Sequence, residues 1–173
     1  MKIKFLKVRD VKSPERGTAE AAGIDFYVPK YDTQFIIDLL DKNPFIQYDD
    51  NYAENTFDIV LRPGERVLIP SGIKTWMEPG TALIAANKSG VASKKGLIFC
   101  AQVVDSDYAG EVHINVINTS NTDVKISTGY KLIQFIHTPV ILSSVEEVSD
   151  TEFTALHESS TRGEGGFGST GTK

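Results

Sequence analysis

Two aspartates directly follow an apolar run in the stretch VVDSDYAGE, residues 103–111. Asp107 comes two positions after Asp105, so an extended backbone would put both carboxylates on the same face. Carboxylates at the end of a strand can hold a water molecule, a metal ion or a sugar hydroxyl. An aspartate-rich β-turn is the alternative interpretation, and this stretch alone leaves both open.

Two further stretches carry groups suited to anions and cations. In NKSGVASKKG, residues 87–96, Lys88, Ser89 and Gly90 put a cation, a hydroxyl and an accessible amide side by side. This combination suits phosphate oxygens, although a hairpin turn with surface lysines explains it equally well. Asp25, in AAGIDFY, lies between small and apolar residues, so its carboxylate must be solvated, paired or hydrogen-bonded.

The last stretch, RGEGGFGSTGTK at residues 162–173, is rich in glycine. Its GEGGFGST segment resembles a P-loop, but Ser169 stands where lysine belongs and no helix-forming sequence follows. Successive glycine amides can still bind an anion, Arg162 can grip a phosphate with two hydrogen bonds, and Phe167 offers a flat face to a base. A flexible tail is the alternative to an arm that closes over a nucleotide.

The overall composition limits the classes of function. A net charge of -5 argues against a wide nucleic-acid-binding face but permits a small basic pocket. Cys100 is the single cysteine, which excludes an intrachain disulfide and favours a reducing compartment, and the three histidines lack metal-ligand spacing. No apolar run approaches the roughly 20 residues of a membrane span, and MKIKFLKVRD lacks a signal-peptide core, so we expect a cytoplasmic protein.

Short β-rich runs separated by Gly, Pro and Asn predict an all-β antiparallel sandwich, jelly roll or barrel. Residues 3–8 form the first run, and RPGERVLIPSGIKTW is expected to form two strands split at Pro70, Ser71 and Gly72. Five more predicted strands follow at spacings of about ten residues: ALIAA, LIFCAQVV, EVHINVIN, LIQFI and VILSSVEEV. Strands and helices do not alternate, which argues against a parallel sheet.

The stretch YDTQFIIDLLDKNPF departs from this pattern, because its apolar residues Phe35, Ile36, Leu39 and Leu40 fall at helical spacing. Asp32 or Thr33 can cap the helix, and Asn43-Pro44 ends it. We expect residues 31–56 to be an insertion. It is either a packing helix with a solvated acidic loop or a module that binds a partner protein.

Together these stretches resemble the five motifs of the homotrimeric dUTPase family. AAGIDFY, NKSGVAS, AQVVDSDYAGE, GYKLIQFI and RGEGGFGSTG occur in the family's order between residues 21 and 171. With its insertion, the chain is most similar to viral or phage members. The resemblance implies a jelly-roll-like domain over residues 1–148, and a linker and arm over 149–173. It also implies a trimer whose sites lie between subunits, each closed by a neighbour's arm.

The resemblance further implies hydrolysis of dUTP to dUMP and pyrophosphate with Mg2+. Asp105 would activate the water that attacks the α-phosphorus, and Asp25 would support water bound to the metal. Tyr108 would pack under the deoxyribose, Phe167 would cover the uracil, and the hairpin with Gln102 and Val103 would read the base. The phosphates would be held by Lys88, Ser89, Gly90 and Gln134 from the body and by Arg162, Gly168, Ser169 and Thr170 from the arm.

Two departures from the family pattern affect the expected site. Lys88 stands where arginine is common, and Gln102 where glycine is common. The dCTP deaminases share the fold, but they need a glutamate base and a serine- and arginine-rich second motif that NKSGVAS lacks. A non-enzymatic binding protein, suggested by residues 31–56, is the alternative from another class.

Overall fold

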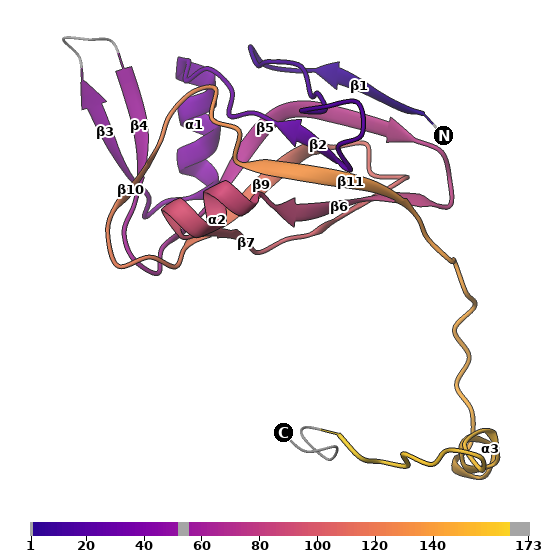
Figure 1. Ribbon diagram of the computed structural model, residues 1–173. Coiled ribbons are helices and arrows are strands. Elements are labelled where there is room, and N and C mark those ends of the chain that lie inside the picture. The colour runs from indigo at the N-terminus through magenta and orange to yellow at the C-terminus, as the bar shows by residue number, and fades with distance from the viewer. Residues whose placement is uncertain (1, 52–55, 167–173) are drawn as a thin grey trace. The chain divides into compact units, whose positions relative to one another are not determined.

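The computed structural model of the protein describes residues 2–51 and 56–166. The chain divides into two compact units, Met1–Ile141 and Leu142–Lys173, which Figure 1 shows from indigo to yellow along the chain.

Antiparallel strands build the first unit, in three sheets over its described residues. One sheet has the order β1 (Ile3–Lys7), β5 (Arg66–Met77), β9 (Glu111–Asn118), β7 (Leu97–Phe99). The second has the order β10 (Val124–Ile126), β4 (Thr56–Leu61), β3 (Gln47–Asn51). The third has the order β2 (Gly23–Phe26), β11 (Ile133–Pro139), β6 (Thr81–Asn87), β8 (Val103–Asp105). The prediction of an antiparallel all-β class is confirmed.

Alternating side chains explain why these strands enclose a core. In β9 every second residue is buried, namely Val112, Ile114, Val116 and Asn118, while the residues between them are half-buried. Val67 and Ile69 of the neighbouring β5 are fully buried as well. A shift of register by one residue would turn the apolar face of a strand toward solvent. The alternating pattern therefore fixes the register in which β5 and β9 pair.

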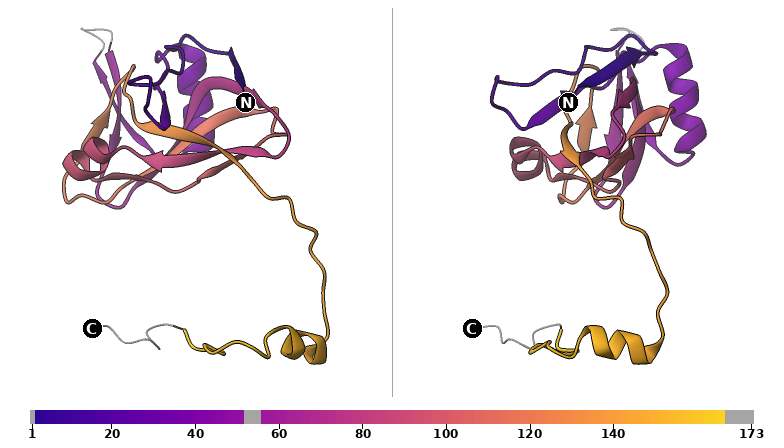
Figure 2. Two further views of the ribbon diagram at one scale, coloured as in Figure 1. Left: turned by 45° about the vertical axis from the view of Figure 1, so that its right-hand side comes forward. Right: turned by 90° about the vertical axis from the view of Figure 1, so that its right-hand side faces the viewer.

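The predicted helix is present as α1 (Thr33–Lys42), followed by Asn43. The Asp32 carboxylate caps it by accepting a hydrogen bond from the Phe35 backbone N–H at 2.8 Å. Phe35 and Leu39 are fully buried, and α1 packs beside β5 on the flank of the sheets, as the right-hand view of Figure 2 shows. The helix is therefore part of the core. The acidic stretch after it contains β3, paired with β4, where a loop was expected.

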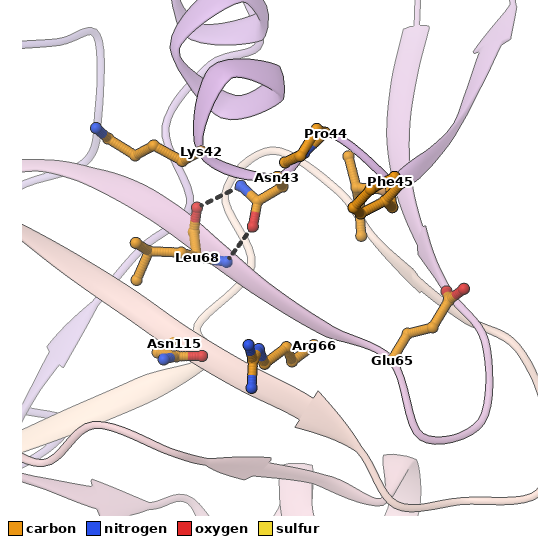
Figure 3. A pocket seen from close by; sticks show the side chains of 9 residues that line it. Lys42, Asn43, Pro44, Phe45, Glu65, Arg66, Leu68 and Asn115 are labelled. Carbon is orange, nitrogen blue, oxygen red and sulfur yellow. Dashed lines mark hydrogen bonds between the residues drawn. The ribbon is translucent and has the colours of Figure 1, made fainter.

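Asn43 joins the end of α1 to the sheet. Its side-chain amide donates to the Leu68 carbonyl at 2.9 Å, and its side-chain oxygen accepts from the Leu68 N–H at 2.8 Å (Figure 3). Since β1 pairs with β5 only over residues 73–77, this carboxamide replaces a neighbouring strand at Leu68.

Three strand predictions are wrong. LIFCAQVV, residues 97–104, is not one strand, because its first part forms β7 and pairs with β9 whereas its last part belongs to β8 and pairs with β6 in another sheet. Pro70, Ser71 and Gly72 do not divide the chain into two strands, because β5 is continuous and absorbs them in a register shift between Pro70 and Lys74. VILSSVEEV, residues 140–148, has no regular structure, because no described strand lies beside it to pair with its backbone.

The second unit contains α3 (Asp150–Leu156) over its described residues. The Ser149 hydroxyl caps α3 by accepting from the Glu152 N–H at 3.3 Å, and the rings of Phe153 and His157 stack with centroids 4.3 Å apart. None of the helices in the described ranges has both the length and the apolar character of a membrane span.

Candidate active site

A buried carboxylate lies at one end of the third sheet. Asp25, on β2, is only 4% exposed, and its two oxygens pair with different lysines. Lys88 Nζ pairs with Oδ1, and Lys131 Nζ lies 3.0 Å from Oδ2. Burial acts to raise the pKa of Asp25, but the hydrogen bonds from Lys88 and Lys131 outweigh burial and lower it. The carboxylate is therefore ionised at neutral pH.

Gln134 belongs to the same cluster through strand pairing. It lies opposite Asp25 of β2 and Ala86 of β6, and its side-chain amide donates to the Asn87 carbonyl at 3.0 Å. A Cβ on Gly23 would lie 2.2 Å from the Gln134 side-chain oxygen, so glycine is required there. Gly23 and Lys131 were not among the predicted site residues, although Gly23 lies in AAGIDFY with Asp25 and Lys131 lies in GYKLIQFI with Gln134.

Lys88, Ser89 and Gly90 lie where β6 passes into α2 (Ser89–Lys95). Ser89 and Gly90 are exposed, and a Cβ on Gly90 would meet nothing within 4 Å. Gly96 ends α2 with a positive φ of 64°. The structure therefore brings Asp25, Lys88, Gln134 and the start of α2 together, with open space over the polar groups of Ser89 and Gly90.

Asp105 and Tyr108 lie on the connection between β8 and β9 (residues 105–110), the Asp105 turn. It joins two sheets, because β8 pairs with β6 whereas β9 pairs with β5 and β7. Asp105 ends β8 with an exposed side chain, and the Tyr108 N–H donates to the Asp105 carbonyl at 3.2 Å. Gln102 and Val103 precede Asp105, and both are exposed. The Gln102 carbonyl accepts from the Ala85 N–H at 2.6 Å, which ties this segment to β6.

Strand pairing separates these two groups within one chain. Asp105 lies opposite Ala82, near the start of β6, whereas Gln134 lies opposite Ala86, near its end. Four residues of extended strand span about 13 Å. One chain therefore keeps the Asp105 backbone well away from the Asp25 cluster.

The described part of the arm includes Arg162 but ends at residue 166. Arg162 Nε donates to the Gly165 carbonyl at 2.7 Å. Phe167, Gly168, Ser169 and Thr170 lie outside the described residues.

The cluster does not form a magnesium site by itself. Among the described residues, no three His, Cys, Asp or Glu side chains are grouped as metal ligands. Both Asp25 oxygens already have lysine partners. A Mg2+ ion at this end of the sheet would need ligands that come with the substrate, such as phosphate oxygens.

A cavity of about 520 Å³ lies between the residues after α1 and strands β5 and β9. Figure 3 shows most of its lining side chains, which are Lys42, Asn43, Pro44, Phe45, Ile46, Glu65, Arg66, Leu68 and Asn115. The lining includes no predicted site residue, so this cavity belongs to the junction between the insertion and the body.

Comparison with known proteins identifies the family. Residues 54–171 match the dUTPase family model. The chain belongs to the dUTPase family. The matched range begins after α1 and after the motif that contains Asp25.

Curated dUTPases agree with this assignment. The deoxyuridine 5'-triphosphate nucleotidohydrolase of Finegoldia magna is 42% identical over 122 residues, which cover 69% of this chain and 80% of the relative. That of Hahella chejuensis is 38% identical over 118 residues, 66% of this chain and 74% of the relative. The predicted dUTP-hydrolysing activity is thereby confirmed.

Solved dUTPases share the fold. The enzyme of Staphylococcus bacteriophage 80alpha, solved with dUPNHPP, superposes with a TM-score of 0.72 at 20% identity and covers 98% of both chains. The enzyme of phage phi11 of S. aureus gives a TM-score of 0.66 at 18% identity, covering 87% of this chain and 97% of that one. The expected jelly-roll-like fold is confirmed.

The ion pairs of Asp25 predict a dependence of stability on pH. Above the unfolded-state pKa of about 3.9 the lowered native pKa contributes its full stabilisation. That contribution falls as the unfolded state takes up protons, and it is lost as pH drops through the native pKa. Asp25→Asn should reduce the unfolding free energy by about 2 kcal/mol at pH 7, and the difference should shrink below about pH 4.

Urea unfolding of both proteins at equal concentration, repeated from pH 3 to 7, measures this difference. Asp49→Asn is the matched control, because it breaks the Lys125–Asp49 pair, in which both side chains are more than half exposed. We expect this control to cost less than about 1 kcal/mol. A difference for Asp25→Asn that stays constant from pH 3 to 7 would contradict the ion-pair assignment.

Proposed function

We propose that dUTP is hydrolysed in sites shared between the subunits of a homotrimer. The observation that carries this proposal is the separation along β6 of Asp105 from the cluster around Asp25. A triphosphate held at Lys88 of one subunit contacts the Asp105 turn of a neighbouring subunit, which supplies Asp105. Each active site therefore uses opposite ends of β6 from two chains.

In this proposal Asp105 is the general base. Its exposed carboxylate accepts a proton from a water molecule while the water oxygen bonds to the α-phosphorus. The bond from that phosphorus to the oxygen leading to the β-phosphate breaks, which releases dUMP and pyrophosphate. A positioned base of this kind contributes about 10²–10⁴-fold to the rate.

The phosphates are held by groups at the end of β6 and the start of α2. Lys88, Ser89, Gly90 and Gln134 are the body's contacts in this proposal. Mg2+ enters as the complex with the triphosphate, where it neutralises phosphate charge. Asp25 holds Lys88 and Lys131 in place, and a role of Asp25 toward metal-bound water remains a prediction.

In this proposal, selectivity for dUTP comes from the Asp105 turn, the strand that precedes it and the arm. Tyr108 packs under the deoxyribose and leaves no room for a 2′-hydroxyl. The backbone near Gln102 and Val103 reads the uracil edge, so analogues that leave its polar groups unpaired are rejected. From the arm, Phe167 covers the base, and Arg162, Gly168, Ser169 and Thr170 hold phosphates.

Asp105→Asn tests the role of the base. The amide keeps the size of the side chain but cannot take the proton, so we expect kcat to fall about 10²–10⁴-fold. The dissociation constant for the analogue dUpNHpp should stay within about threefold of the parent value, because binding uses other groups. Pyrophosphate release and calorimetry measure the two quantities. Retention of more than a tenth of the turnover would exclude Asp105 as the base.

Truncation after Thr161 tests the role of the arm. Since the removed residues supply phosphate and base contacts, kcat/KM for dUTP should fall by about 10²-fold or more. Sedimentation velocity should show the same oligomer as the full chain. A shortened chain with near-normal kcat/KM would refute the assignment of the arm.

A protein-binding role for the insertion is a second proposal. It is supported by the apolar side chains that the insertion exposes, Ile37 at 55%, Phe45 at 91% and Tyr48 at 46%. Proteins with this fold include a phi11 dUTPase with a species-specific insert and a phage 80 dUTPase with a SaPI-inducing capacity. The proposed partner is a regulatory protein with a complementary apolar surface.

Ile37→Glu combined with Phe45→Ser tests this surface without touching the buried Phe35 and Leu39. The double variant should hydrolyse dUTP within about twofold of the parent rate, because surface substitutions perturb the fold little. It should lose at least one protein that the parent chain retains from extracts of cells in which it is produced. Identical sets of retained proteins would contradict the proposal.

A further inference from the structure

Arg9 connects the insertion to the start of β9, which directly follows the Asp105 turn. Its Nε and Nη2 lie 2.8 and 3.0 Å from the two carboxylate oxygens of Glu111, in a bidentate pair. Nη2 also lies 2.6 Å from Oδ2 of Asp38, on α1. The Arg9 and Glu111 side chains are 15% and 14% exposed, so solvent screens this pair weakly.

Asp38 is itself held in place. Gln34, one turn earlier on α1, donates to Asp38 Oδ1 at 2.9 Å and leaves Oδ2 for Arg9. The hydrogen bond from Arg9, with that from Gln34, lowers the pKa of Asp38. Asp38 therefore presents a charged, oriented oxygen to Arg9 at neutral pH.

Gly72 is the second partner of the Glu111 carboxylate. Its N–H donates to Glu111 Oε1 at 2.7 Å, from the register shift in β5. Gly72 has a φ of 74°, and a Cβ there would lie 2.9 Å from Val11 and 3.1 Å from the Arg9 Cβ. Arg9 therefore packs closely against this irregular turn of β5, and the Glu111 carboxylate is fixed from two sides.

The Glu111 backbone in turn fixes Tyr108. The Tyr108 hydroxyl donates to the Glu111 carbonyl at 3.0 Å. A Cβ on Gly110 would lie 2.4 Å from the same hydroxyl oxygen, so the Tyr108 ring covers Gly110. The Tyr108 N–H then closes the turn onto the Asp105 carbonyl. Hydrogen bonds therefore connect Asp38 to Arg9 and Arg9 to the Glu111 carboxylate. The Glu111 carbonyl then connects to Tyr108 and the Asp105 turn.

We infer that Arg9 and Asp38 are positioning residues that hold the Tyr108 ring and the Asp105 turn through Glu111. This inference rests on the proposed function, in which Tyr108 excludes the 2′-hydroxyl of a ribonucleotide. Without the Arg9–Glu111 pair the ring can shift and admit a ribose. The insertion then contributes to substrate selectivity through Asp38, from outside the site.

The test is the ratio of kcat/KM for dUTP to kcat/KM for UTP, measured well below each variant's Tm. Misplacement of a substrate-positioning group by about 1 Å can cost up to about 10²-fold, so the ratio should fall about tenfold or more in Glu111→Gln and Arg9→Lys. Glu111→Gln keeps an oxygen for the Gly72 N–H, and Arg9→Lys keeps the charge but not the bidentate contact. Asp38→Asn, which removes the charge and one of the two acceptor oxygens, should lower the ratio about threefold.

Asp49→Asn is the matched control, because it removes the Lys125–Asp49 ion pair on β3, which does not contact the Asp105 turn. Its dUTP/UTP ratio should equal that of the parent. A purely structural ion pair would lower the Tm in the three variants and leave their ratios unchanged, which would overturn the inference. Tyr108→Ala separates the two levels of argument. If Tyr108→Ala keeps the parent's dUTP/UTP ratio, the proposed role of Tyr108 is overturned and the inference with it. If Tyr108→Ala lowers this ratio while the Arg9, Asp38 and Glu111 variants keep the parent's value, the inference alone is overturned.

Discussion

The pairing of β6 with β8 along one edge and with β11 along the other fixes where the polar residues of this enzyme lie. β8 carries Asp105 to one end of β6, and β11 carries Gln134 to the other, beside Asp25. Neither side chain can approach the other without breaking the backbone hydrogen bonds of the sheet. The geometry of the proposed shared site follows from this constraint, because a triphosphate has to contact both ends.

The insertion is joined to the body in three physically different ways. Phe35 and Leu39 bury apolar surface, Asn43 satisfies the backbone of Leu68, and Asp38 pairs with Arg9. Burial and the backbone hydrogen bonds account for stability, while the ion pair connects α1 through Arg9 to Glu111, next to the Asp105 turn. An insertion attached in this way is a part of the domain, and its exposed residues remain available to another protein.

Local patterns in the sequence predicted local structure well. Helical spacing with Asp32 and Asn43 at its ends gave α1 correctly, because capping and periodicity act within a few residues. Pro70 and Gly72 misled the strand assignment, since a register shift lets a long strand keep both. The run 140–148 has a strand-like composition, but composition does not show whether a partner strand is present.

The prediction of the site also missed contacts between residues that are far apart in the sequence. Asp25 was expected to need a partner, but Lys88 and Lys131 are 63 and more than 100 positions away, and only the fold brings them together. Arg9 and Glu111 are 102 positions apart and belong to no common motif. The motifs predicted the residues of the proposed site, while the ion-pair partners of those residues became visible only in the structure.

Lys88 follows the end of β6 and Asp105 lies beside its start, and this separation has a consequence for genetics. With shared sites, a chain defective at one end of β6 still supplies a sound second end to its neighbour. Two inactive alleles, one altered at each end, would therefore rebuild some intact sites when their products assemble together. Intragenic complementation of this kind would follow from the proposed sharing of sites between subunits, whereas two defects at the same end could never compensate one another.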